Sequence, residues 1–160
     1  MDDRATSSLR VRALTAHDRL PVFELLQMLD DWDSAEITRT MAHLDRVLFE
    51  PAGERHGVLV VEGGDGDIPA LLGWTADPDT VWITELAAAP RPGQSGLVGA
   101  LLARLDVLAG GPTPRRVVVD LAVAGRLGGL ERCLATCGYH SESLSPPGRG
   151  RRWIKHLPTA

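Results

Sequence analysis

Apolar and polar positions in the first part of the chain predict one strand and two helices. Residues 9–13 alternate between apolar and arginine side chains, which is typical of a strand with one buried face. Apolar residues at helical spacing then predict a helix that begins near Thr15 or Asp18, and a second helix from Ser34 to just before Pro51. This part of the chain therefore reads as strand, helix, helix.

The spacing of apolar residues changes from residue 57 onward. Short apolar strands are predicted at 57–62 and 70–75, joined by a loop of glycine and aspartate that favours a hairpin, and a third strand at 81–88. A Gly/Pro loop at 90–96 then leads into leucines at helical spacing, which stop at Gly110. The last of these strands is thus followed by a glycine loop and a helix.

The final part of the chain predicts a central strand, a helix and a last strand. The valines within 116–121 form a continuous apolar run, typical of a strand covered on both faces. A helical stripe ends at Gly138, and a last strand is expected at 153–157. The predicted order βααβββαβαβ describes one α/β domain at 9–160, a mixed sheet packed by helices, after a flexible N-terminal segment at 1–8.

Composition and charge narrow the classes of function. At 160 residues, with 44% apolar and 24% charged residues, the chain fits one globular domain without a membrane span. A formal charge of −4 disfavours binding to nucleic acid or anionic membranes. Cys133 and Cys137 lack the spacing of a redox or zinc motif, which indicates reduced thiols and a cytoplasmic protein. The histidines show no metal-ligand spacing, so no metal is expected.

The glycine-rich segment Gly93–Gly99 is a candidate anion site. The first N–H groups of a helix have no partner within the helix and lie at the positive end of its dipole, so a pyrophosphate can dock there. Glycines let a ligand approach the backbone, and Ser95 is expected to cap the helix or to donate its hydroxyl. The segment matches neither GxxxxGK(S/T) nor GxGxxG, which disfavours nucleoside triphosphates and dinucleotides. An ordinary strand-to-helix turn is the alternative.

The order of elements, with this loop between the fourth strand and the third helix, resembles the GNAT (GCN5-related N-acetyltransferase) superfamily over residues 9–157. Glu85–Pro90 looks like the fourth strand of that family, and Gly93–Val98 lies where its (Arg/Gln)-x-x-Gly-x-(Gly/Ala) loop is expected. The pair Gly138-Tyr139 resembles the Gly-Phe that closes the family's fourth helix. The resemblance covers nearly the whole chain but rests on few residues.

Three positions depart from the pattern of the family. Gly93 replaces the usual Arg or Gln, Val98 replaces the usual small residue, and Leu134 replaces the customary tyrosine. The missing tyrosine concerns protonation of the departing CoA sulfur, for which Cys133 or Tyr139 is a weak substitute. These departures favour a rival hypothesis, in which the chain is a catalytically degenerate module that binds CoA or acts as a scaffold.

The resemblance implies an acyl-CoA-dependent N-acetyltransferase, with acetyl-CoA as the donor and direct attack by a primary amine in a ternary complex. The acceptor is a small-molecule or peptide amine, N-terminal acylation of a protein being the weaker option, and a homodimer is left open. The residues expected to bind the donor are Leu86, Ala87, Ala88, Gly93, Gln94, Ser95, Gly96, Leu97, Val98 and Gly99.

Glu85 is the candidate catalytic residue. It is an acidic residue in an apolar strand, just before the segment that binds pantetheine in the family, so its carboxylate is expected to take a proton from the ammonium of the acceptor. A structural ion pair with Arg115 or Arg116 is the alternative.

An acidic corner, formed by Asp30, Asp31 and Asp33 around Trp32, is the candidate acceptor site, with Asp31, Trp32 and Asp33 as the expected binding residues. Carboxylates and an indole together favour a cationic amine, through ion pairing and a cation–π contact. A solvated helix end is the alternative.

Overall fold

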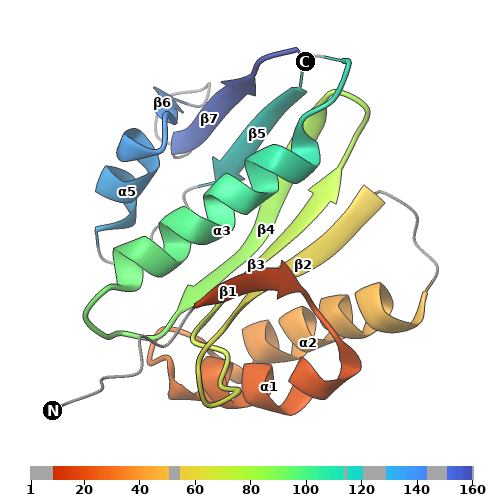
Figure 1. The fold of residues 1–160 in the computed structure, drawn as a ribbon, viewed down its shortest axis with the longest axis vertical. Coiled ribbons are helices and arrows are strands. Elements are labelled where there is room, and N and C mark those ends of the chain that lie inside the picture. Colours follow the sequence, from red (N-terminus) through yellow and green to blue (C-terminus); the bar gives the residue numbers. More distant parts are fainter. Residues whose placement is uncertain (1–8, 51–54, 114, 121–128, 144–150, 160) are drawn as a thin grey trace, which may run out of the picture.

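A single mixed sheet of seven strands forms the centre of the molecule (Figure 1). The computed structural model describes residues 9–50, 55–113, 115–120, 129–143 and 151–159. The strands are arranged in the order β1-β2-β3-β4-β5-β7-β6, and among these described strands only β4 and β5 pair in parallel. Their bounds are β1 (Arg10–Ala13), β2 (His56–Glu62), β3 (Ala70–Ala76), β4 (Thr80–Ala88), β5 (Arg115–Asp120), β6 (His140–Ser143) and β7 (Arg151–Leu157).

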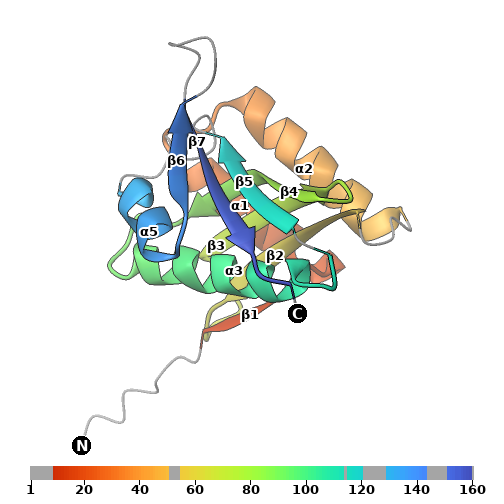
Figure 2. The same ribbon diagram turned by 90° about the horizontal axis from the view of Figure 1, so that it is seen from above.

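Helices cover both faces of the sheet, as Figure 2 shows for α2 and α3 on opposite sides. One face packs against α1 and α2, and the other packs against α3 and α5. The helices are η1 (Ala16–Asp18, a 3-10 turn), α1 (Arg19–Met28), α2 (Ser34–Phe49), α3 (Gln94–Ala109) and α5 (Leu130–Thr136).

The alternation of side chains along the central strands produces two hydrophobic cores. Leu71 and Ala87 lie in the core under α1 and α2, whereas Leu72 and Leu86 lie in the core under α3. Because both faces are covered, these strands read as continuous apolar runs rather than as alternating patterns.

Most of the predicted elements are confirmed, and the exception is β6. The structure adds this strand between α5 and the last strand, so the order is βααβββαβαββ. All four residues of β6 are exposed at the edge of the sheet, so they lack the apolar alternation by which a strand is identified. The N-terminal segment 1–8 and part of the loop before the last strand lie outside the described residues.

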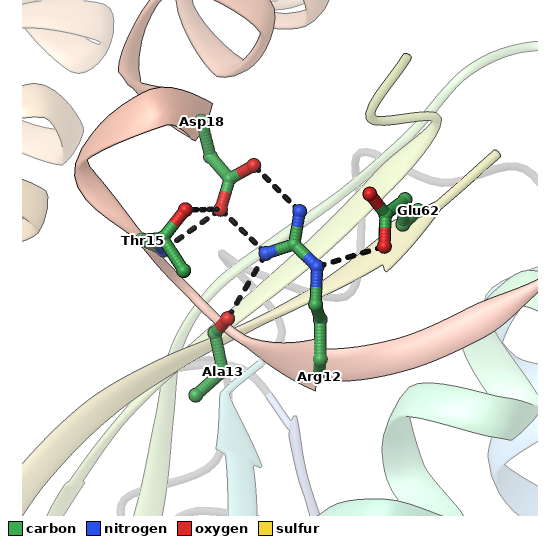
Figure 3. A network of polar contacts seen from close by, with 5 residues as sticks. All are labelled: Arg12, Ala13, Thr15, Asp18 and Glu62. Carbon is green, nitrogen blue, oxygen red and sulfur yellow. Dashed lines mark hydrogen bonds and ion pairs between the residues drawn. The ribbon is translucent and has the colours of Figure 1, made fainter. Parts of the chain in front are cut away.

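Arg12 ties the first strand to its neighbours (Figure 3). Its guanidinium donates to both carboxylate oxygens of Asp18, at 2.6 and 2.8 Å, and through Nε to Glu62 at 3.0 Å. Asp18 also accepts from the N–H and hydroxyl of Thr15. Burial alone would raise the pKa of Asp18, but the hydrogen bonds from Arg12 and Thr15 outweigh it and hold this pKa below its ordinary value. The network thus joins β1, η1 and β2.

Among the described residues, no helix is both long and apolar enough to cross a lipid bilayer.

Candidate active site

Strand β4 continues beyond its pairing with β5, and no strand among the described residues pairs with the remaining part of this edge, called here the open edge. The two strands pair only from Thr80–Arg116 to Ile83–Val119, whereas β4 runs on to Ala88 (Figure 1). Thr84 lies at this divergence, where the register with β3 skips one residue and forms a bulge. The bulge at Thr84 lies where β4 ends its pairing with β5. Because bulges bend a strand, this bulge accounts for the divergence of the two strands.

The open edge of β4 presents backbone groups of alternate residues. Ala89 donates to Pro69 across the β3 side, and hydrogen-bonding pairs in an antiparallel ladder recur every second residue. Glu85 and Ala87 therefore bond toward β3, while Leu86 and Ala88 face the opposite edge. No described strand pairs with that edge beyond Ile83. The N–H and carbonyl of Leu86 and the N–H of Ala88 are therefore directed away from β3, along the open edge of β4.

The first turn of α3 lies next to this open edge. The side-chain amide of Gln94 donates to the carbonyl of Ala88 at 3.1 Å and so joins the two elements. Gly93 precedes the helix with φ = 86°, a left-handed conformation that favours glycine. The carbonyl of Gly93 accepts from the N–H groups of Gly96 and Leu97, and the N–H of Ser95 has no acceptor among the described residues. A free helix N-terminus thus adjoins an unpaired strand edge.

The glycines of this turn leave open space above the backbone. A Cβ atom added at Gly96 or at Gly99 would meet no atom within 4 Å. By contrast, the side chains of Leu97 and Val98 are buried in the core under α3. Leu97 and Val98 therefore have only main-chain atoms to offer to a donor, as do the buried Leu86, Ala87 and Ala88. The expected cap at Ser95 is wrong, because the N-cap is Gly93 and Ser95 lies inside the helix.

Glu85 points away from α3, toward the face covered by α1 and α2. Its Oε2 lies 2.8 Å from Nδ1 of His43 on α2, and the hydroxyl of Thr84 donates to the same oxygen. The side chain of His43 is 6% exposed and that of Glu85 is 15% exposed. The alternative of an ion pair with Arg115 or Arg116 is not observed, and Arg116 donates to Thr80 instead.

Gly73 on β3 makes room for this carboxylate. It pairs directly with Glu85, and a Cβ at Gly73 would overlap Oε2. A strand residue without a side chain is therefore needed opposite Glu85.

His43 is a site residue that the sequence analysis did not identify. It lies in α2 beside Leu44, within the apolar face of the helix, and is one of few buried polar residues of the described chain. A polar residue in such a stripe is a signal that needs a partner. However, its partner Glu85 is 42 residues away in sequence, and no local pattern connects them.

The residues of the acidic corner have different surroundings. Asp33 is the N-cap of α2, where it accepts from the N–H of Glu36 at 2.8 Å while the Glu36 carboxylate accepts from the N–H of Asp33 at 3.0 Å. Trp32 packs against the core under α1 and α2, and Asp31 is exposed. Asp33 lies ten residues before His43, about 15 Å along the helix axis. The structure thus assigns Asp33 a capping role and separates it from Glu85.

Cys133, on α5, contacts the first turn of α3, whereas Tyr139 lies away from this turn. The Sγ atom of Cys133 donates to the carbonyl of Ser95 at 3.5 Å. Burial, reinforced by the adjacent Cys137, raises the pKa of Cys133 to about 11, so it is a neutral thiol at neutral pH. Tyr139 is buried beside Lys155, and Lys155 pairs with Asp106 near the other end of α3. Burial raises the pKa of the Tyr139 phenol well above its ordinary value. Of the two weak proton donors, only Cys133 adjoins the glycine turn.

Comparisons with known proteins identify the fold through solved structures. No family model and no curated protein matches the chain. An acetyltransferase of the GNAT family from Staphylococcus aureus Mu50 is similar in structure, with a TM-score of 0.73 and 6% identity, covering 94% of this chain and 100% of that chain.

Two further solved structures contain coenzyme A. The PaiA N-acetyltransferase from Thermoplasma acidophilum, in complex with coenzyme A, has a TM-score of 0.63 and 12% identity, covering 92% of this chain and 98% of that chain. The spermidine N-acetyltransferase from Vibrio cholerae, in complex with CoA and spermine, has a TM-score of 0.58 and 13% identity, covering 93% and 95%. With nearly complete coverage at low identity, this chain has the GNAT fold.

Proposed function

We propose that the chain is an N-acyltransferase, which transfers an acetyl or short acyl group from acyl-CoA to a primary amine in a ternary complex. The observation that carries the proposal is the open edge of β4 beside the first turn of α3, with the carboxylate of Glu85 on the same strand. In this arrangement the edge of β4 offers hydrogen-bonding groups to the thioester, the start of α3 offers N–H groups to the pyrophosphate, and Glu85 offers a carboxylate to the ammonium proton.

The donor is bound chiefly through backbone groups. The start of α3 offers N–H groups and the positive end of the helix dipole to the pyrophosphate, and Gly96 leaves space for it. The peptide groups of Leu86 and Ala88 pair with the pantetheine arm as a missing strand would. The bound CoA in two solved structures of the same fold supports this assignment.

The chemical step is direct attack of the amine on the thioester carbon. The ammonium first loses a proton to Glu85, and the C–N bond then forms. The C–S bond breaks with release of CoA thiolate, and the second proton of the attacking nitrogen passes to this thiolate, which leaves a neutral amide and CoA thiol. Backbone N–H groups at the open edge of β4 stabilise the oxyanion that develops on the carbonyl. Because the pKa of a thiol is about 8.5, the thiolate leaves without a strong acid, which suits a site that has Leu134 in place of a tyrosine.

The acceptor is a cationic amine of small size. The V. cholerae spermidine N-acetyltransferase was solved with spermine, which supports amines of this class as candidates. Within the connection from α1 to α2, Asp31 is exposed and available for an ion pair, whereas Asp33 is engaged at the helix end. Both cysteines are free thiols, in keeping with the cytoplasm as the site of action.

Ligand-dependent thermal unfolding tests the donor site. Acetyl-CoA at 100 times its dissociation constant is expected to stabilise the native state by about 2.7 kcal/mol, with a smaller effect from NADH and ATP. In Gly96→Asp the stabilisation is expected to disappear, because a side chain and a negative charge would occupy the pyrophosphate position. Equal stabilisation by all three ligands, or by none, contradicts the assignment, as does unchanged acetyl-CoA affinity in folded Gly96→Asp.

The second candidate function is a CoA-binding module without turnover. It is favoured by the departures at Gly93, Val98 and Leu134. Stabilisation by acetyl-CoA together with no acetylation of any amine, across polyamines, aminoglycosides and peptides with free N-termini, would identify this function.

A further inference from the structure

Only one of the two carboxylate oxygens of Glu85 is held by the protein. Oε2 is contacted by Nδ1 of His43 and by the hydroxyl of Thr84, and it lies over the bare backbone of Gly73. Oε1 has no hydrogen-bond partner among the described residues, although the side chain is partly exposed. Oε1 is therefore the carboxylate oxygen that no described residue engages.

The contacts of Oε2 define the hydrogen-bonding state of the pair. An ionised carboxylate only accepts hydrogen bonds, and the hydroxyl of Thr84 already donates to Oε2. The base role proposed for Glu85 requires an ionised carboxylate, which has no proton to give. In that role Nδ1 of His43 carries the proton of the shared hydrogen bond and donates it to Oε2. In this tautomer Nε2 of the neutral ring is an acceptor, and it is buried without a partner among the described residues.

Packing fixes the ring of His43 in this orientation. The residue is buried on the face of α2 that packs against the sheet, and its ring meets that of His56 edge to face, with centroids 5.9 Å apart and an interplanar angle of 87°. A ring held by a helix and a neighbouring side chain cannot turn freely, so the Nδ1–H stays directed at Oε2.

We infer that His43 is a positioning residue, which holds Oε2 of Glu85 so that Oε1 faces the acceptor amine and takes its proton. The inference rests on the proposed function, because the reacting amine belongs to that proposal. Its geometry, however, is a property of the chain without ligands and has a test of its own. A carboxylate fixed at one oxygen loses little freedom when the amine binds, and misplacement of a reacting group by about 1 Å costs up to about 10²-fold in rate.

The first experiment examines the hydrogen bond without any substrate. In protein labelled with ¹⁵N-histidine, NMR is expected to show His43 as the Nδ1–H tautomer, with its ring-proton signal shifted downfield by the carboxylate. The signal is expected to move on Glu85→Leu and to stay in place on Thr40→Val, a matched change at another buried polar position of α2. A His43 ring protonated on Nε2 alone, or insensitive to Glu85→Leu, overturns the inference.

The second experiment compares variants of His43 in amine acetylation, with spermine and peptides with free N-termini as the probes. His43→Leu is expected to lower kcat about 10- to 100-fold with the KM for acetyl-CoA unchanged. His43→Asn is expected to recover most of the loss, because its amide N–H stands close to the place of Nδ1–H. Thr40→Val controls for packing of α2, and melting temperatures confirm that each variant is folded.

A double-mutant comparison separates positioning from a merely structural role. In the Glu85→Gln background, His43→Leu is expected to add less than about 3-fold, since residues that act as a unit are not additive. Additive losses, or an Asn variant as slow as the Leu variant, overturn the inference. If no probe is acetylated and acetyl-CoA gives no stabilisation, the proposed function fails, whereas the NMR result still decides whether His43 holds Glu85.

Discussion

Glu85 lies between the open edge of β4 and a buried histidine. Its strand position places it beside the open edge of β4, and its carboxylate reaches through the sheet surface to the buried His43. A base at this position must accept a proton from the amine before attack. Its contribution is therefore visible in the pH dependence of the rate.

Glu85→Gln keeps the size of the side chain and removes its basicity. We expect kcat to fall by about 10² to 10⁴ at neutral pH, with the KM for acetyl-CoA nearly unchanged. Part of the loss should be recovered at higher pH, where free amine is more abundant. Steady-state kinetics from pH 6 to 10 measure this, and a folded variant with kcat within a few-fold of the parent contradicts the role of Glu85.

The sequence made Glu85 a candidate but could not supply its partners. A charged residue in an apolar strand stands out locally, whereas His43 and Gly73 acquire meaning only through the packing of α2 on the sheet and the register of β3 with β4. The suggested arginine partners were wrong for the same reason. Arg115 and Arg116 lie on β5, which pairs with β4 only before Glu85.

At the scale of single elements, the start of α2 combines a cap with a candidate ligand site. Asp33 accepts from the N–H of Glu36 and Glu36 returns the bond, so the two form a capping box. The sequence analysis instead grouped Asp33 with Asp31 and Trp32 as an acceptor site. The structure shows that Asp33 is engaged at the helix end, whereas Asp31 is exposed.

Single substitutions are expected to separate these tasks. Asp33→Ala should lower the free energy of unfolding by about 1 kcal/mol, as measured by urea denaturation. Asp31→Asn should leave stability unchanged but raise the KM for a cationic acceptor, an effect that shrinks in high salt. If Asp31→Asn changes neither KM nor its salt dependence, the exposed carboxylate is only a solvated helix-end charge.

Elements with a strong apolar period were predicted well, and those without one were not. The helix α3 and the strands β2, β3 and β4 were found within a few residues of their observed bounds, because each buries a regular stripe or run. The strand β6 was missed, since it is exposed at the sheet edge and defined only by its pairing with β7. The open edge of β4 was likewise invisible, because it depends on where β5 ends.

At the scale of the whole molecule, the fold isolates the site from the network that ties its first strand. Arg12 and Asp18 join β1 and η1 to β2 at one margin of the sheet, while Glu85 and the start of α3 lie around β4 at its centre (Figures 1 and 3). No hydrogen bond between described residues joins the two regions. Stability at acid pH can therefore be probed at Asp18 without altering the candidate site.

Asp18 is expected to make the molecule sensitive to acid. Its pKa in the folded chain is lower than in the unfolded chain, where it is about 3.9. The ionised form is thus favoured by folding, so its contribution is fully present above about pH 4 and is lost as pH falls through the folded pKa. Urea unfolding from pH 2 to 7 should show this loss. Asp18→Asn should have a lower free energy of unfolding at neutral pH, and this free energy should change less with pH across the acid range.

Asp45→Asn, which breaks the exposed pair with Arg19, is the matched control and should have a smaller effect, because exposed ion pairs contribute little. Equal acid sensitivity of the parent and Asp18→Asn would show that other carboxylates dominate.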